Sequence, residues 1–312
     1  YLRMCVDMNV DYLALSYVAD DQDILVVRER LAELGRPIPI IAKIERAEAF
    51  ARLDGILRRA DAVMIRRGDL GAQIEITRVP LVQKDIMRLA NRAGVPVIIA
   101  TQMLGSMIRA PRPTRAEASD VSNAIADGAD GVLLSSETAI GEYPVEAVDM
   151  MSRIVRETES EDIDRMPTGG VRDGAQGSFA ETTASVAVEA ADRVQARIIV
   201  CFSESGRTAR LVSKYRPDAS ILAFCKSDET RRRLALPWGV RTDKMEGHAD
   251  VEEMVAQVEQ RLLERNLVRT GDQMVLVFGS PMGVSGRTNT VRLHRIGGAP
   301  DTTERPKSAG SA

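Results

Sequence analysis

Short apolar runs recur at regular intervals through the first half of the chain. Each has four to eight residues rich in Val, Ile, Leu or Ala, a pattern typical of parallel strands buried on both faces. The runs lie at 12–18, 38–44, 62–66, 95–101 and 131–135. Between them apolar residues recur at helical spacing, as in the stretch 24–34, which indicates amphipathic helices. This alternation predicts an α/β fold with a parallel sheet.

Polar residues and glycines mark the ends of the expected helices. Asp20 precedes the stretch 24–34 as a candidate N-cap, and Gly35 follows it as a candidate C-cap. Gly94 closes the next amphipathic stretch in the same way. Thr114 and Glu117 have the spacing of a capping box. The turn chemistry therefore agrees with the hydrophobic pattern.

Residues 1–158 contain five strand–helix units. A closed (β/α)₈ barrel has eight units and usually spans about 250 residues. The five units therefore form either an open doubly wound sheet or strands 4 to 8 of a barrel. The chain begins with Tyr rather than Met, which favours a partial (β/α)₈ TIM-type barrel without its first three units.

The second half of the chain is organised differently. Residues 159–179 are acidic and then Gly-rich without periodicity, which predicts a linker. Residues 180–296 predict a smaller three-layer α/β domain, and the polar residues 297–312 predict a disordered tail. In this domain strands are expected at 197–202, 220–224, 274–278 and 290–295, and helices near 181–193, 207–215, 229–235 and 250–266.

Composition narrows the classes of function. The chain has 42 basic and 45 acidic side chains and a net charge of −3, so it lacks the basic footprint of a nucleic-acid-binding protein. No apolar run approaches the roughly 18 residues of a membrane span. Its three cysteines lie far apart and form no C-x-x-C pair, which argues against a disulfide framework. We therefore expect a soluble, cytoplasmic protein.

Lys43 and Glu45 stand two positions apart at the end of the second apolar run. Period-two alternation places both on one face of a strand, and sites in parallel α/β folds form at the carboxyl ends of strands. A cation beside a carboxylate suits an anionic intermediate held by lysine and a metal. The alternative is a strand-end ion pair of little energetic weight.

Polar residues follow the other strands as well. Gly68 permits close backbone approach to a ligand, and Asp69 supplies a second carboxylate for a cation such as Mg²⁺. The Thr101 hydroxyl can bind an anion or relay a proton. Each feature alone also fits an ordinary turn or helix cap. Together they predict one shared rim of polar side chains at the carboxyl ends of the strands. Its expected members are Ser16, Lys43, Glu45, Asp69, Thr101, Ser135 and Glu137.

A second candidate site lies between a strand and a helix of the second domain. Hydroxyls and backbone N–H groups at a helix N-terminus bind anions, and an arginine adds a bidentate phosphate contact. The loop consists of Ser203, Glu204, Ser205, Gly206, Arg207 and Thr208. The negative charge of Glu204 favours a monophosphate over a bisphosphate. The alternative is a Ser-rich turn with a capped helix. The Gly-rich segment 279–288 could cover the same site.

Several motifs in this order resemble the pyruvate kinase family. They are LALSYV, IIAKIE, RRGDLG, IIATQMLGSMI, PRPTRAEASDVSNAIADGADGVLLSSETAIGEYPVEAV, FSESGRTARLVSKYRP, LALPWGV and TNTVRLHRIG. The resemblance runs from about residue 1 to residue 296 and covers both domains. The long PRPTRAEASDV to GEYPVEAV block is the most specific of them.

The resemblance implies phosphoryl transfer from phosphoenolpyruvate to ADP, which gives pyruvate and ATP, with Mg²⁺ and usually K⁺. Lys43 is similar to the lysine that stabilises the transferring phosphoryl group and the enolate, and Glu45 and Asp69 to the Mg²⁺ ligands. The N–H groups of Gly68 and Asp69, with the Thr101 hydroxyl, would hold the substrate carboxylate, and Thr101 would assist protonation. Loop 203–208 would bind a phosphorylated effector. Members of the family typically assemble as homotetramers.

Some positions depart from the family pattern. Arg66 stands where Ala is usual, and it either crowds the substrate pocket or adds a phosphate contact. Gln73 replaces a usual Glu, Ser136 a usual Gly and Tyr17 a usual Phe, while Ala19 falls where a basic residue is common. The monovalent-cation ligands and an arginine of the site would lie in a missing N-terminal part, so the chain alone is expected to be inactive.

Two other functions remain open from the sequence. The chain could be a non-catalytic paralogue that acts as a binding or regulatory subunit, an alternative that Arg66 and Ser136 support. It could also be a Mg²⁺-dependent lyase acting on pyruvate-like enolates, which would explain Lys43, Glu45 and Asp69 but not the second domain.

Overall fold

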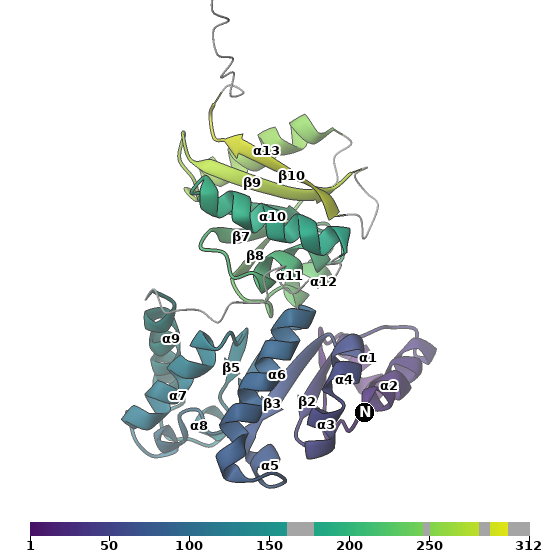
Figure 1. Ribbon diagram of the computed structural model, residues 1–312, viewed down its shortest axis with the longest axis vertical. Coiled ribbons are helices and arrows are strands. Elements are labelled where there is room, and N and C mark those ends of the chain that lie inside the picture. Colours follow the sequence, from purple (N-terminus) through teal and green to yellow (C-terminus); the bar gives the residue numbers. More distant parts are fainter. Residues whose placement is uncertain (161–177, 246–249, 281–287, 299–312) are drawn as a thin grey trace, which may run out of the picture. The chain divides into compact units, whose positions relative to one another are not determined.

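The computed structural model describes residues 1–160, 178–245, 250–280 and 288–298. They form two compact units, each with its own β-sheet (Figure 1). The predicted linker at 159–179 and the predicted tail at 297–312 lie almost wholly outside the described residues.

The sheet of the first unit is parallel throughout, as the hydrophobic pattern predicts. Its strands lie side by side in chain order, with Ile44 of β2 opposite Ile65 of β3 and Arg66 of β3 opposite Ala100 of β4. A doubly wound sheet would reverse this order at a switch point, so the arrangement is that of consecutive barrel strands. The strands are β1 Leu13–Leu15, β2 Ile40–Ile44, β3 Ala62–Arg66, β4 Val97–Ala100 and β5 Gly131–Leu133.

The predicted helix ends are confirmed in this unit. Asp20 accepts the N–H of Gln22 as an N-cap, Thr114 and Glu117 form a complete capping box, and Gly94 closes its helix in the left-handed conformation. The helices are α1 Leu2–Asp7, α2 Asp21–Glu33, α3 Ala47–Ala51, α4 Leu53–Arg59, α5 Arg67–Gly71, α6 Val79–Ala93, α7 Arg115–Ala126, α8 Ser136–Ala139 and α9 Pro144–Ser160, with 3₁₀ turns η1 Ile76–Arg78 and η2 Gly105–Ile108.

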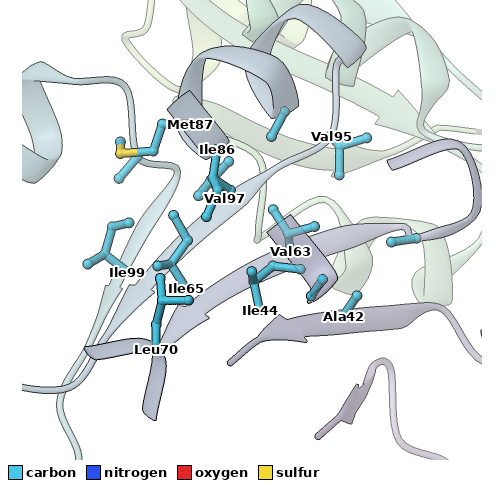
Figure 2. Packing of buried hydrophobic residues seen from close by; sticks show 14 of the residues in the cluster. Ala42, Ile44, Val63, Ile65, Leu70, Ile86, Met87, Val95, Val97 and Ile99 are labelled. Carbon is cyan, nitrogen blue, oxygen red and sulfur yellow. The ribbon is translucent and has the colours of Figure 1, made fainter. Parts of the chain in front are cut away.

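The two faces of the sheet carry different side chains because neighbours along a strand alternate. One face packs beneath Ile86 and Met87 of α6 (Figure 2). Its strand residues include Ala42, Ile44, Val63, Ile65, Val97 and Ile99. Full burial of each Ile or Val contributes about 1.5–3 kcal/mol. The opposite face, which a barrel would enclose, carries a separate cluster that includes Ile41, Met64 and Ile98.

The second unit is a mixed sheet in the order β10-β9-β6-β7-β8. The sequence pattern does not predict the edge strand β8, because its residues are largely polar and only Asp243 is buried. In Figure 1, β9 and β10 lie between α10 and α13, which agrees with three layers. The elements are α10 Phe179–Arg193, β6 Ile198–Phe202, α11 Arg207–Lys214, β7 Ser220–Cys225, α12 Asp228–Arg233, β8 Val240–Lys244, α13 Val251–Glu264, β9 Gln273–Gly279 and β10 Thr288–Arg295.

Candidate functional site

Three charged side chains meet where β2 and β3 end. Lys43 and Glu45 lie on one face of the sheet because they are two positions apart. The parallel register pairs Ile44 with Ile65, and this pairing brings Arg66, the next residue of β3, alongside Glu45. The Lys43 ammonium lies 3.0 Å from Glu45 Oε1, and Arg66 Nη1 lies 2.9 Å from the same oxygen. We use "strand-end rim" for Ser16, Lys43, Glu45, Arg66, Asp69 and Thr101.

Glu45 is the most enclosed member of the strand-end rim, with a fully buried side chain. Its Oε2 accepts the N–H of Tyr17 at 2.8 Å. Tyr17 has a φ of 56°, a left-handed conformation that strains a residue other than glycine. Burial would raise the pKa of Glu45, but the Tyr17 N–H and the cations of Lys43 and Arg66 outweigh it and hold the pKa below its ordinary value. Glu45 is therefore a buried carboxylate that its neighbours keep ionised.

Asp69 lies in the first turn of α5, directly after β3. Its Oδ2 is buried and has no hydrogen-bond partner among the described residues, although Arg66 Nε lies 3.2 Å away. A buried carboxylate oxygen without a partner is costly unless a cation is close. The guanidinium of Arg66 thus lies between two carboxylates, with Nη1 toward Glu45 and Nε toward Asp69.

The two carboxylates fit a hard divalent cation. The described residues contain no group of three or more His, Cys, Asp and Glu side chains placed to hold a metal. Mg²⁺ needs fewer protein ligands, since one or two carboxylates usually suffice when substrate oxygens and waters complete its coordination. Glu45 offers an ionised carboxylate and Asp69 an oxygen without a hydrogen bond, and both already face one positive group.

Thr101, at the end of β4, contacts the loop that follows β3. Its Oγ1 accepts the N–H of Gly68 at 3.2 Å, which leaves the hydroxyl proton free to be donated. Thr101 and Gln102 have φ values of 71° and 57°. Such residues cost about 1–3 kcal/mol each and persist only where the surroundings hold them. The structure therefore brings the predicted Gly68 and Thr101 together, with the Gly68 N–H already engaged by the hydroxyl.

Arg67 holds this strained turn, a role that the sequence analysis did not predict. Its Nη2 donates to the carbonyl oxygens of Thr101 and Gln102, at 2.9 Å each. Its Nη1 pairs with Asp120 at 2.6 Å. The RRGDLG motif is a signal for such an arginine, but it does not show which of the two points inward. Arg67 does, and it is a positioning residue for Thr101.

Two further rim predictions have different outcomes. Ser16 belongs to the rim, since its Oγ accepts a hydrogen bond from Lys43 Nζ at 2.6 Å. Glu137 is arranged differently, because both oxygens of its buried carboxylate serve backbone N–H groups. Its two carboxylate oxygens accept the backbone N–H groups of Leu104 and Ser135 at 3.2 and 2.8 Å. Glu137 therefore ties the segments after β4 and β5 together.

In the second unit, the candidate anion loop 203–208 connects β6 to α11. Ser203 Oγ accepts the N–H of Thr208 at 3.3 Å, and Thr208 Oγ1 lies 2.7 Å from Thr288 Oγ1. Gly206 has a φ of 80°, a conformation that glycine adopts without strain. These contacts are those of a capped helix start. The hydroxyls of Ser203 and Thr208 are thus engaged within the protein.

The charged groups of loop 203–208 are exposed. Glu204 pairs with Lys226 at 2.9 Å, and both side chains are well exposed. Arg207, the first residue of α11, is exposed as well. Most of the segment 279–288, which was predicted to cover this loop, lies outside the described residues.

Comparisons with known proteins cover both units. The family model described as "Pyruvate kinase, barrel domain" matches residues 1–148, and "Pyruvate kinase, alpha/beta domain" matches residues 181–294. Curated relatives named pyruvate kinase include those of Mycobacterium tuberculosis strain H37Rv, 40% identical over 296 residues, and Corynebacterium glutamicum, 41% identical over 300 residues. That of Dictyostelium discoideum is 41% identical over 301 residues.

Each of these matches covers 95% of this chain. They cover 62%, 61% and 59% of the respective relatives, so the chain spans about three fifths of their length. The matches extend through the motifs that form the strand-end rim and through both sheets. This chain belongs to the pyruvate kinase family.

Proposed function

We propose that the protein transfers a phosphoryl group from phosphoenolpyruvate to ADP. The observation that carries this proposal is the Lys43 ammonium, 3.0 Å from Glu45 at the edge where β2 ends, with Asp69 on the other side of Arg66. Phosphoryl transfer depends mainly on positioning and on neutralising negative charge. A lysine and two carboxylates that can hold a divalent cation supply such a site.

Each rim residue has a distinct part in this proposal. The bond from phosphorus to the enol oxygen breaks and a bond to the terminal phosphate oxygen of ADP forms, while Lys43 neutralises charge on the phosphoryl group and the enolate oxygen. Glu45 and Asp69 would hold Mg²⁺, which supplies further neutralisation of phosphate charge when it is bound. The Thr101 hydroxyl would bind the substrate carboxylate and pass a proton to the enolate carbon. The backbone N–H groups of Asp69 and Gly68 would add to this contact, the Gly68 N–H by leaving its hydrogen bond to Thr101 Oγ1.

Product analysis tests this function. We expect ATP and pyruvate to form in equal amounts from phosphoenolpyruvate and ADP when Mg²⁺ is present, as followed by ³¹P and ¹H NMR. The assay uses both the chain itself and the chain preceded by the matching N-terminal portion of a curated relative. We expect activity only in the second, because among the described residues β1 and β5 each pair with one strand and the five strands do not close into a barrel.

The same spectra separate the other functions. Carbon–carbon cleavage products in place of ATP would show a lyase. Binding of phosphoenolpyruvate without turnover would show a non-catalytic paralogue, a function that the position of Arg66 between Glu45 and Asp69 favours. Either result would refute the proposed transfer.

We further propose that the loop 203–208 binds a phosphate monoester as an effector. The exposed guanidinium of Arg207 and the N-terminus of α11 support this proposal. We expect Arg207→Ala to weaken binding of a hexose monophosphate about tenfold, since a charge-assisted hydrogen bond contributes about 1.5–3 kcal/mol. Calorimetry measures the affinity, with Arg193→Ala as the control because Arg193 ends α10 and pairs with Glu189. Equal affinities in wild type and Arg207→Ala would exclude this role.

The compartment, the K⁺ dependence and the oligomeric state follow from the same proposal. We propose a cytoplasmic enzyme activated by K⁺ and assembled as a homotetramer, with no residue of this chain assigned to K⁺. All three cysteines are free, and Cys201 and Cys225 are buried, as expected in a reducing compartment. No helix among the described residues has the length and apolar character to cross a bilayer.

A further inference from the structure

Arg66 is the one charged member of the strand-end rim that the proposed reaction does not use. Its Nη1 lies 2.9 Å from Glu45 Oε1 and its Nε lies 3.2 Å from Asp69 Oδ2. These are the two carboxylates that would hold the divalent cation. The guanidinium therefore contacts the same pair of ligands that the metal needs.

The charges of the strand-end rim indicate that Arg66 and a divalent cation compete for the carboxylates of Glu45 and Asp69. The two carboxylates of Glu45 and Asp69 are balanced by the cations of Lys43 and Arg66, so the site carries no net charge as it stands. A divalent cation that entered beside both cations would add two positive charges to a partly buried group, where Coulomb repulsion is strong. Removing the Arg66 charge leaves a net negative site that attracts a cation.

One hydrogen bond holds Arg66 in this position, from its Nη1 to Glu45 Oε1 at 2.9 Å. Its side chain is 33% exposed, and its contact with Asp69 lacks hydrogen-bond geometry, since Asp69 Oδ2 has no hydrogen-bond partner among the described residues. Arg67 differs, because it is buried and bonded to the backbone of the Thr101 turn. A swing of the Arg66 side chain into solvent would free both carboxylates while β3 and α5 stay in place.

We infer that the Arg66 guanidinium occupies the divalent-metal site and must be displaced before Glu45 and Asp69 can bind a metal ion. This inference rests on the proposed metal site of the phosphoryl transfer. Arg66 would therefore raise the metal concentration that is needed to fill the site.

Direct metal binding tests the inference without an activity assay. The free Mn²⁺ signal in electron paramagnetic resonance is titrated for wild type, Arg66→Met, Arg66→Ala and Arg66→Lys. We expect Met and Ala to tighten Mn²⁺ binding about tenfold or more by removing a positive charge at the ligands, and Lys to stay near wild type. Arg28→Met is the matched control, because Arg28 is 35% exposed and pairs with Asp61 away from the rim.

The Mn²⁺ titrations distinguish a failure of the Arg66 competition from a failure of the metal site itself. Mn²⁺ binding of equal strength in wild type, Arg66→Met and Arg66→Ala would overturn the competition while leaving the metal site in place. No binding in any variant would overturn both. A gain in Arg66→Ala that persists in the Arg66→Ala/Glu45→Gln double variant would place the ion elsewhere and also overturn the inference.

Discussion

In the chain joined to the matching N-terminal portion of a relative, replacing Lys43 by Met is expected to reduce kcat for pyruvate formation about a thousandfold, the upper range for removing one group that stabilises charge in a transition state. Methionine keeps the length and the apolar stem of the side chain but removes the ammonium, which lies 3.0 Å from Glu45 and 2.6 Å from Ser16 Oγ. Lys84, Lys226 and Lys244 pair with carboxylates outside this rim, namely Asp127, Glu204 and Asp228.

Lys84→Met is the matched control for this prediction. Lys84 is half-exposed on α6 and pairs with Asp127, outside the strand-end rim. Its replacement should leave kcat within about twofold while costing about 1–3 kcal/mol of stability, because the largely buried Asp127 loses its partner. The assigned role of Lys43 would be refuted by unchanged turnover in Lys43→Met with an unchanged melting temperature.

Much of the fold follows from hydrophobic periodicity. Each of the five apolar runs contains one parallel strand, and the capping residues Asp20, Gly94 and Thr114 lie at helix ends as predicted. Strand β8 was not predicted, since an edge strand is half solvated and Val240–Lys244 reads as polar. Short helices such as α3 and α5 were not predicted either, because one or two turns show little periodicity.

The strand-end rim was predictable where alternation along one strand decides the geometry. Lys43 and Glu45 share a face because they are two positions apart, whatever the register of the neighbouring strands. The position of Arg66 depends on the register between β2 and β3 and on its side-chain conformation, neither of which the pattern reveals. Glu137 shows that a polar residue after a strand need not join the rim. Its carboxylate is buried and accepts backbone N–H groups.

Glu45→Gln and Asp69→Asn are each expected to weaken Mn²⁺ binding about a hundredfold or more, because replacing even an outer partner of a metal site costs about 10–100-fold. Each change is nearly isosteric and removes one charged ligand. Glu48→Gln is the control, since Glu48 lies in the first turn of α3, exposed and paired with Arg46 at 3.3 Å. The pKa of Glu48 is also lowered, by hydrogen bonding and by the Arg46 charge, so the control loses an ionised carboxylate as well.

The Mn²⁺ titration of these two variants decides whether Glu45 and Asp69 hold one metal ion beside Lys43. We expect that either change alone removes nearly all of the binding, that both together remove no more, and that Glu48→Gln leaves the affinity unchanged. Wild-type affinity in either Glu45→Gln or Asp69→Asn would contradict it.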